Sequence, residues 1–195
     1  MYRSVQFFYF EKFMSKSAQK ILRTAQTLFN QHSFTAVGVD LIRDVSGCSK
    51  TTLYSHYKNK QQLINAVLHA RDAQFQHELN AYVQGLQGLE GLLALIDWHV
   101  MWFLQDDFKG CLFIRAVAEA DPHDRQVIEI AQQHKQQISA LIAQFCQQLE
   151  QAKWSELIYT LVEGLISRCL IEGVNLQMIE QLKAQIEALL NPTKV

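Results

Sequence analysis

Residues that break helices are scarce in this chain. Only 2 prolines and 8 glycines occur among its 195 residues. Sandwiches and barrels of short strands need many turns, and turns depend on these two residue types, so the scarcity disfavours an all-β fold. Because 49% of the residues are hydrophobic, the chain is also able to bury a substantial core. We predict an all-α protein of about nine helices.

Charge is divided unevenly along the sequence. Residues 1–60 contain 9 Lys and Arg against 3 Asp and Glu, a net charge of +6, whereas residues 61–195 contain 9 against 16, a net charge of −7. A basic end on an acidic chain is typical of a polyanion-binding domain joined to a body with another role. Chance clustering of surface charge is the alternative. We predict the polyanion-binding domain over residues 16–60 and the body over residues 61–195.

Residues 1–15 are expected to form an N-terminal extension. Its apolar stretch, Phe7–Phe10, is far shorter than the roughly 20 residues that span a bilayer. Two charged residues, Glu11 and Lys12, follow at once, where a signal peptide would have a small-residue cleavage site. Neither export nor a membrane partner is therefore expected.

The four cysteines, at positions 48, 111, 146 and 169, show no CxxC pair and no regular spacing. Such a pattern indicates neither a structural zinc site nor a disulfide framework. We predict no bound metal and no cofactor. Free thiols persist in reducing compartments, so the expected location is the cytoplasm.

The basic end has the local signals of a helix-turn-helix. Apolar residues at helical spacing predict a first helix over 17–31, and a second over 39–46 that buries Ile42 and Val45. Gly47 follows as a residue able to adopt the left-handed conformation, and Ser49 is a favourable N-cap. The third helix, 50–56, then buries Leu53 and turns its polar residues outward. A helix presented in this way fits the DNA major groove.

The segment 47–60, GCSKTTLYSHYKNK, resembles the recognition segment of the TetR family of transcriptional regulators. The segment 21–29, ILRTAQTLF, is similar to the preceding helix of that family, and Gly110–Phe113 resembles a stretch found in one subgroup. The resemblance implies a three-helix DNA-binding head joined to a helical-bundle body for ligand binding and dimerisation. Members of the family are most often repressors.

The resemblance also assigns roles to residues of the third helix and its flanks. Positions that contact backbone phosphates in the family are occupied here by Thr52, Tyr54, Tyr57 and Lys60. Positions that reach base edges are occupied by Lys50, Thr51, Ser55 and His56. Phosphate contacts supply affinity and base contacts supply sequence choice. For Tyr57 a role as a core aromatic residue is the alternative.

Lys60 has additional support from its position. Asn59 and Gln62 resemble a capping box, which places Lys60 in the first turn of the next helix, where backbone amides also attract phosphate. An ordinary solvated lysine is the alternative.

Two positions depart from the family pattern. Gly38 lies where many members have a Ser or Thr that caps the second helix and contacts phosphate, so we expect Thr35 to substitute for it. Arg43 occupies a position that is more often small or apolar. We expect Arg43 either to extend beside the turn or to reach the DNA backbone.

Beyond Lys60 the helical periodicity continues to the end of the chain. Further helices are predicted from Lys60 past Tyr82, and over residues 92–104, 111–120, 122–151, 154–172 and 176–190. Asp121 followed by Pro122 is a helix-start signal, with Asp121 as the N-cap.

The penultimate helix carries an apolar stripe too wide for a single contact, which implies a second helical partner. In the TetR family the last two helices form a four-helix interface in a homodimer. The residues predicted for this interface are Leu157, Ile158, Leu161, Leu165, Ile166, Cys169, Ile179, Leu182 and Ile186. A monomer with a large core is the alternative.

The acidic body has the composition of a ligand receptor, and the family resemblance implies a small-molecule effector that releases DNA. The residues predicted to line its site are Trp98, His99, Trp102, Phe103, Cys111, Phe113, Arg115, Glu119 and Phe145. Ordinary core packing is the alternative for each of them. Cys111, beside Lys109 at a predicted helix start, also suggests a repressor that senses oxidants or electrophiles through its thiol.

No HExxH, GxSxG, P-loop or GxGxxG element occurs, so we do not expect an enzyme. The predicted function is a homodimeric transcriptional regulator that binds a double-stranded DNA operator and is controlled by a small molecule. A helical ligand-binding or interaction protein without effector-controlled DNA binding is the alternative from another class.

Overall fold

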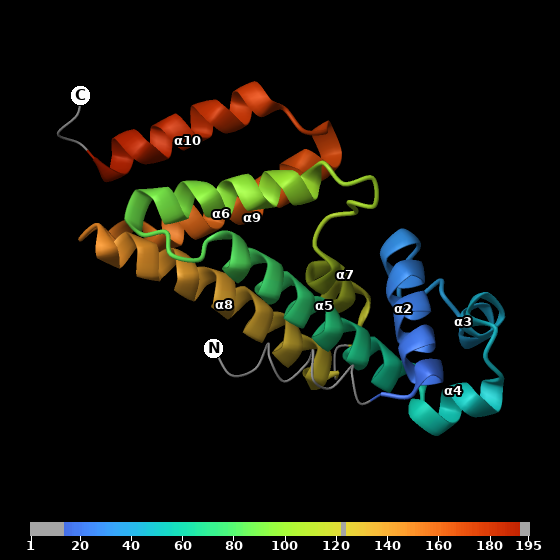
Figure 1. The fold of residues 1–195 in the computed structure, drawn as a ribbon. Helices are drawn as coiled ribbons and strands as arrows, with labels where there is room; N and C mark the ends of the chain where they lie inside the picture. Colours follow the sequence, from blue (N-terminus) through green and yellow to red (C-terminus); the bar gives the residue numbers. More distant parts are fainter. Residues whose placement is uncertain (1–13, 122–123, 192–195) are drawn as a thin grey trace. The chain divides into compact units, whose positions relative to one another are not determined.

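The computed structural model describes residues 14–121 and 124–191, and within these ranges the chain is all-α (Figure 1). Its nine described α-helices are α2 (Lys16–Gln31), α3 (Val39–Ser46), α4 (Lys50–His56), α5 (Lys60–Tyr82), α6 (Gly88–Phe103), α7 (Leu112–Glu119), α8 (Arg125–Gln148), α9 (Ser155–Glu172) and α10 (Leu176–Leu190). The prediction of an all-α fold with about nine helices is confirmed. Residues 1–13 of the expected N-terminal extension lie outside the described residues.

The chain divides into two compact units. Unit 1 consists of residues 1–77 and 111–134, and it includes α2, α3, α4 and α7. Unit 2 consists of residues 78–110 and 135–195, and it includes α6, α9 and α10. The long helices α5 and α8 each contribute residues to both units. The functional division at residues 60 and 61 remains a prediction, and unit 1 extends well beyond it.

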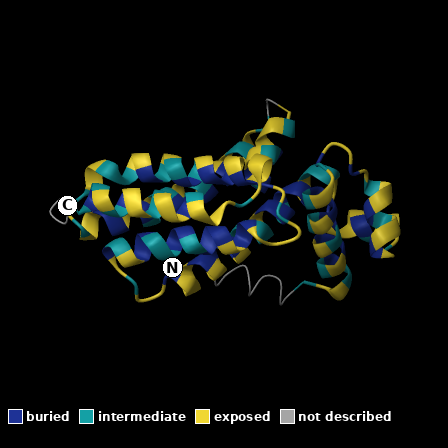
Figure 2. Cartoon of the chain, turned by 90° about the horizontal axis from the view of Figure 1, so that it is seen from above, coloured by how far each residue is buried: buried dark blue, intermediate teal, exposed yellow. Residues whose placement is uncertain are grey.

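The core of unit 1 is built on the amphipathic helix α2. Its apolar residues Ile21 and Phe29 are fully buried, as are Ile42 of α3 and Leu53 of α4. Figure 2 shows the same segregation along the helices, with buried positions on one side and exposed positions on the other. The expectation that Ile42 and Leu53 are buried is therefore confirmed.

The expectation that Val45 is buried was wrong. Its side chain is 57% exposed, and Ser46 is fully buried in its place. Ser46 lies one turn after Ile42 on the same side of α3, and its hydroxyl donates a hydrogen bond to the Arg43 carbonyl oxygen at 3.2 Å. A buried hydroxyl satisfied within its own helix costs little, so a polar residue occupies the inner face.

In unit 2, α6 and α8 approach each other closely at Gly91. A Cβ atom at this position would lie 2.3 Å from the Phe145 ring of α8, so only glycine allows the aromatic ring to pack there. Gly88 and Gly91 both lie inside α6, which begins four residues before the predicted start at residue 92. The Gln148 side chain also accepts a hydrogen bond from the Gly88 amide at 2.7 Å.

The start of α8 also differs from its prediction. The helix begins at Arg125, and the Asp124 carboxylate accepts a hydrogen bond from the Val127 amide at 3.3 Å. Asp121 instead accepts a bond from the Asp124 amide through its carbonyl oxygen, so the prediction of Asp121 as N-cap was wrong. Separately, none of the described helices combines the length and the hydropathy needed to cross a lipid bilayer.

Candidate nucleic-acid interface

The geometry of the turn between α3 and α4 follows from two residues. Gly47 adopts the left-handed conformation at a φ of 62°, which ends α3. Ser49 then caps α4 by accepting a hydrogen bond from the Thr52 amide at 3.0 Å. Both predictions are confirmed. Helices α2, α3 and α4 contact one another and form the helix-turn-helix head.

Burying Leu53 turns the remainder of α4 outward. The exposed residues of this outward face are Lys50, Thr51, Tyr54, Ser55 and His56. Thr52 is half-buried, and its hydroxyl lies 2.8 Å from the Ser49 hydroxyl. The outward face therefore carries hydroxyl groups, an imidazole and an amine, all of which are able to hydrogen-bond to phosphates or base edges.

The end of α4 is tied to α2. His56 Nε2 lies 3.1 Å from the Ser15 hydroxyl and 2.9 Å from the Ser17 hydroxyl, at the start of α2. Tyr57 is only 7% exposed, and its hydroxyl donates a hydrogen bond to the Ala18 carbonyl oxygen at 3.1 Å. Of the two roles considered for Tyr57, the core aromatic role fits the structure, because both its ring and its hydroxyl are committed inside the head.

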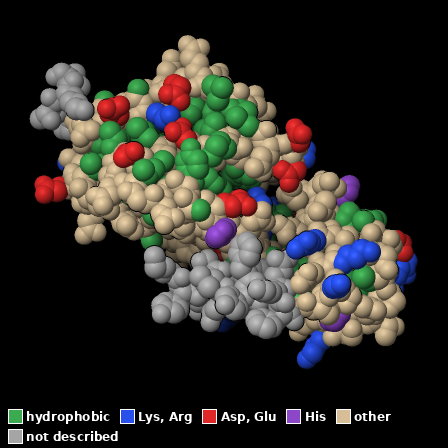
Figure 3. Space-filling model, in the orientation of Figure 1, with side chains coloured by type: hydrophobic (Ala, Val, Ile, Leu, Met, Phe, Trp, Pro, Cys, Tyr) green, Lys and Arg blue, Asp and Glu red, His purple; other side chains and the backbone are tan. Residues whose placement is uncertain are grey.

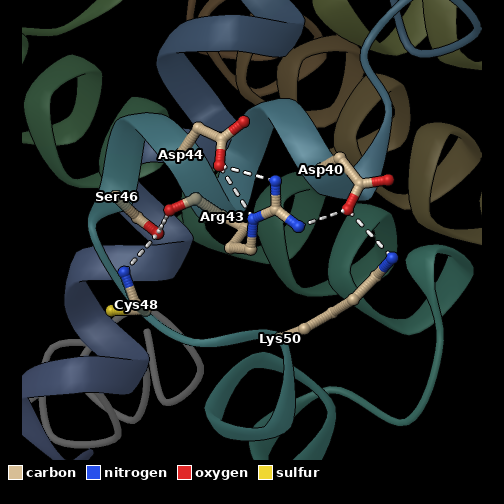
Figure 4. Close-up of polar contacts among 6 residues, drawn as sticks. All are labelled: Asp40, Arg43, Asp44, Ser46, Cys48 and Lys50. Atoms are coloured by element: carbon tan, nitrogen blue, oxygen red, sulfur yellow. Dashed lines mark hydrogen bonds and ion pairs between the residues drawn. The ribbon is translucent and has the colours of Figure 1, made fainter.

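Four charged residues form an ion cluster on the head, which we define as Asp40, Arg43, Asp44 and Lys50 (Figure 4). The Asp40 carboxylate accepts hydrogen bonds from Arg43 Nη1 and from Lys50 Nζ, each at 2.9 Å. The Asp44 carboxylate lies 2.7 Å from Arg43 Nη2. Lys50, predicted to contact DNA, and Arg43, for which DNA contact was one of two alternatives, thus have acidic partners in the free protein.

The predicted phosphate ligands Thr35 and Lys60 both lie near Glu119 of α7. The Glu119 carboxylate accepts hydrogen bonds from the Thr35 amide at 2.8 Å and from the Thr35 hydroxyl at 2.9 Å. Burial lowers the pKa of Lys60, and the Glu119 charge acts in the opposite direction. The three residues line an open cleft of about 450 Å³ within unit 1, together with Phe34 and Ile64.

The start of α5 matches the predicted capping box in part. Asn59 Oδ1 accepts a hydrogen bond from the Gln62 amide at 2.8 Å, as expected of an N-cap. The Gln62 side chain reaches back to the Lys58 amide at 3.2 Å, one residue earlier than the box requires. Lys60 therefore occupies the first turn of α5. Figure 3 shows several Lys and Arg side chains gathered on the visible surface of the head.

The predicted ligand-binding residues fall into the two units. Trp98, His99, Trp102, Phe103 and Phe145 belong to unit 2, and Cys111, Phe113, Arg115 and Glu119 belong to unit 1. In unit 2 the rings of Trp98 and His99 lie 5.2 Å apart and those of Trp102 and Phe103 lie 5.6 Å apart, which is ordinary aromatic packing.

The remaining members in unit 1 have structural partners. The Phe113 ring stacks on His134 at 3.8 Å, and Arg115 donates two hydrogen bonds to the Asn30 carbonyl oxygen near the end of α2. Cys111 precedes α7, is partly buried and packs against the core of unit 1. These surroundings do not favour the thiol-sensing alternative.

Most of the predicted dimer residues contribute to the core of unit 2. Six of them are buried within the chain, namely Ile158, Leu165, Ile166, Cys169, Ile179 and Ile186. Leu161 and Leu182 are half-buried, and Leu157 is 43% exposed. Ile171, which the sequence argument did not select, is 83% exposed. Burial raises the pKa of the Cys169 thiol.

Sequence reasoning missed the acidic side of the interface. The spacing of Asp40 and Arg43, three residues apart on one helix, was a usable signal for their ion pair. No pattern linked Asp40 to Lys50 across the turn, or Thr35 to Glu119 across 84 residues. Such pairs are formed by tertiary structure.

Residues 21–67 match the family model described as bacterial regulatory proteins, tetR family. Over 63 residues the chain is 30% identical to the uncharacterized HTH-type transcriptional regulator Rv1255c of Mycobacterium tuberculosis. That alignment covers 32% of this chain and 31% of the relative, so only about a third of the relative's length is matched.

The fold is similar to those of solved TetR-family regulators. SCO4454, a TetR-family transcriptional regulator from Streptomyces coelicolor, superposes with a TM-score of 0.78 at 23% identity, covering 100% of this chain and 97% of that one. The reduced form of E. coli NemR superposes with a TM-score of 0.74 at 19% identity, covering 89% of this chain and 98% of that one. Residues 21–67 thus match the tetR family model, and the chain has the fold of TetR-family regulators.

Proposed function

We propose that this chain is a TetR-family transcriptional regulator, a cytoplasmic homodimeric repressor that binds a palindromic double-stranded DNA operator and is released from it by a small-molecule effector. The observation that carries the proposal is the outward face of α4. Five exposed polar side chains project from a helix whose opposite side is anchored by the fully buried Leu53. A recognition helix needs this combination of a rigid inner side and a hydrogen-bonding outer side.

Dimerisation is supported by an apolar stripe on α9, which we define as Leu157, Leu161, Gly164 and Ile171. The spacings of 4, 3 and 7 residues keep these positions on one side of the helix. Nothing lies within 4 Å of the position that a Gly164 Cβ would occupy, so a second helix is able to approach closely there. A twofold dimer also suits two operator half-sites about 34 to 36 Å apart.

Control by an effector is supported by the attachment of α7 to the head. Glu119 binds Thr35 in the segment that joins α2 to α3, and Arg115 binds the Asn30 carbonyl oxygen in the last turn of α2, so two side chains of one helix hold this part of the head. A ligand that displaces α7 would therefore change the population of head positions that fit DNA.

The DNA-binding proposal is tested by capture of genomic DNA fragments at two salt concentrations. The wild-type chain should select a few fragments, with affinity that falls steeply as salt rises, because phosphate contacts release counterions. Tyr54→Ala and Lys60→Ala should lose this capture. Lys109→Ala, which removes one exposed lysine from unit 2, is the charge-matched control and should behave as wild type.

Failure of folded, dimeric protein to capture any fragment at either salt concentration would contradict the proposal and favour a ligand-binding or interaction protein. The effector is tested by the shift in Tm against a panel of metabolites and drugs. A true effector should raise Tm with concentration and should weaken fragment capture in the same range. A compound that raises Tm without affecting capture would be a bound ligand but not an effector.

A further inference from the structure

The ion cluster lies at the edge of the proposed DNA surface. Arg43 and Lys50 carry positive charge, Asp40 and Asp44 carry negative charge, and all four side chains reach solvent, with exposed fractions of 37%, 49%, 61% and 63% in that order (Figure 4). The cluster as a whole is therefore electrically neutral. This is unexpected on a segment whose overall excess of Lys and Arg predicts a polyanion partner.

Asp40 and Asp44 have different partners. A single oxygen of Asp40, Oδ1, binds both Arg43 and Lys50, and so connects α3 to the first residue of the recognition helix α4. Among the residues that the structure describes, Asp44 binds Arg43 and does not bind Lys50. The hydrogen bond from Lys50 is the main reason that the pKa of Asp40 lies below its usual range, so its carboxylate stays charged at neutral pH.

An exposed carboxylate in this place affects phosphates in two ways. It competes with them for the Lys50 ammonium, and it repels them, because like charges close together are unfavourable. Exposed ion pairs are weak, so a correctly placed operator is able to displace Asp40. Non-specific binding depends almost entirely on phosphate contacts, and it therefore loses more from this competition than specific binding does.

We propose that Asp40 is a specificity-determining residue, which holds Lys50 back from sequence-independent phosphate contacts until base contacts compensate for its release. This inference rests on the proposed DNA-binding function. It assigns to an acidic residue of α3 a role in discrimination between operator and unrelated DNA.

The test uses the full chain with a captured genomic fragment and with an unrelated duplex of equal length. Asp40→Asn removes one negative charge and frees Lys50. Asp44→Asn removes the same charge but leaves Lys50 bound to Asp40, so it is the matched control. Lys50→Ala and the double variant, Asp40→Asn combined with Lys50→Ala, complete a double-mutant cycle for the Asp40–Lys50 pair. Because both aspartates are exposed, the variants should fold, and Tm is measured for each.

Asp40→Asn should tighten binding to the unrelated duplex and steepen the slope of log Kd against log salt by about 0.9, the value for one added phosphate contact. That slope corresponds to an additional loss of about 3.5-fold in affinity between 50 and 200 mM salt. The ratio of unrelated to operator Kd should fall. Asp44→Asn should leave the slope close to wild type, and Lys50→Ala should cancel the effect of Asp40→Asn.

Equal changes in Asp40→Asn and Asp44→Asn would assign the effect to net charge and overturn the inference. Persistence of the tighter binding in the double variant would overturn it as well, because Lys50 would not be responsible. If the wild-type chain binds DNA but Asp40→Asn leaves the ratio of unrelated to operator Kd unchanged, only this inference is overturned. Absence of DNA binding by the wild-type chain would overturn the proposed function and the inference together.

Discussion

The outward sides of α4 and α9 differ in kind. On α4 the exposed residues are polar, and even the largest of them, Tyr54 at 42% exposure, carries a hydroxyl. On α9 the exposed stripe is apolar, with Leu157 at 43% and Ile171 at 83% exposure. Both helices bury their other side in the core of their own unit, through Leu53 in one case and Ile158 in the other.

This difference separates two kinds of partner. Hydroxyl and ammonium groups lose little by staying in water, so the side of α4 requires a partner only when a polyanion supplies matched acceptors. An apolar stripe gains free energy whenever it is covered, which favours a second protein surface. Binding at α4 should therefore weaken steeply with salt, and binding at α9 should not.

The largest expected effect comes from replacing, one at a time, two neighbouring residues of α4 by alanine. Leu53→Ala should lower the free energy of unfolding by about 2 to 5 kcal/mol, because it leaves a cavity in the core of the head. Tyr54→Ala, one residue later, should leave the unfolding free energy nearly unchanged and abolish fragment capture. Chemical denaturation and the capture experiment measure the two effects on the same samples.

A loss of stability in Tyr54→Ala comparable with that of Leu53→Ala would contradict the division of α4 into an inner and an outer side. Capture that survives in Tyr54→Ala would instead place the DNA-binding surface elsewhere on the head.

The second effect concerns the α9 stripe. Gly164→Arg should leave the protomer folded, since its Cβ meets nothing within 4 Å and arginine favours helix more than glycine does. The bulky side chain should nevertheless block a partner helix. We expect dimer Kd to rise by roughly 30-fold or more, about 2 kcal/mol, as measured by sedimentation equilibrium.

Glu156→Arg provides the control, because it introduces the same side chain at an exposed position of α9 outside the stripe. It should retain the wild-type association. Dimers of undiminished affinity in Gly164→Arg would show that the α9 stripe is covered by something other than a second copy.

The success of sequence reasoning on this chain depended on how local each signal was. Gly47 and Ser49 determine the turn through their own backbone and side chain, and both were predicted correctly. The inner residues Ile42 and Leu53 follow from helical periodicity, which also gave the number of helices. The prediction that Val45 is buried failed because a helix of eight residues has several positions near the edge of its buried side.

Contacts between residues far apart in the chain could not be predicted from the sequence. The bonds of Glu119 to Thr35 and of Lys50 to Asp40 depend on how helices pack, and no spacing rule predicts them. Aromatic residues gave the same signal whether they line a cavity or fill a core, so Trp102 and Phe113 were grouped although they belong to different units.

A smaller effect is expected where α7 holds the head. Glu119→Ala should lower the free energy of unfolding by about 1 kcal/mol, less than the 1.5 to 3 kcal/mol typical of bonds to charged groups, because the site is partly open to solvent. Thermal and chemical denaturation measure it. DNA capture should also become less sensitive to the effector, since α7 loses one of its attachments to the head.

Glu129→Ala is the matched control, because Glu129 is an exposed glutamate of α8 in the same unit. Stability equal in the two variants would indicate that the Thr35 contact contributes nothing measurable. If the effector weakens DNA capture by Glu119→Ala as much as capture by the wild-type chain, the coupling between effector and DNA depends on Arg115 instead.

The smallest effect is a gain at the start of α3. Gly38 occupies the N-cap without any side-chain hydrogen bond, its φ of −82° suits any residue, and nothing lies within 4 Å of an added Cβ. Gly38→Ser should therefore supply the missing cap and raise the free energy of unfolding by a few tenths of a kcal/mol, about the difference between Gly and Ser at N-caps.

The control is Gly38→Ala, which adds a Cβ without a hydroxyl and so separates the effect of the cap from the loss of backbone entropy in the unfolded chain. If the added hydroxyl also extends the polar surface of the head, Gly38→Ser should tighten DNA binding while Gly38→Ala does not. Equal affinities in the two variants would confine the polar surface to α4 and its flanks.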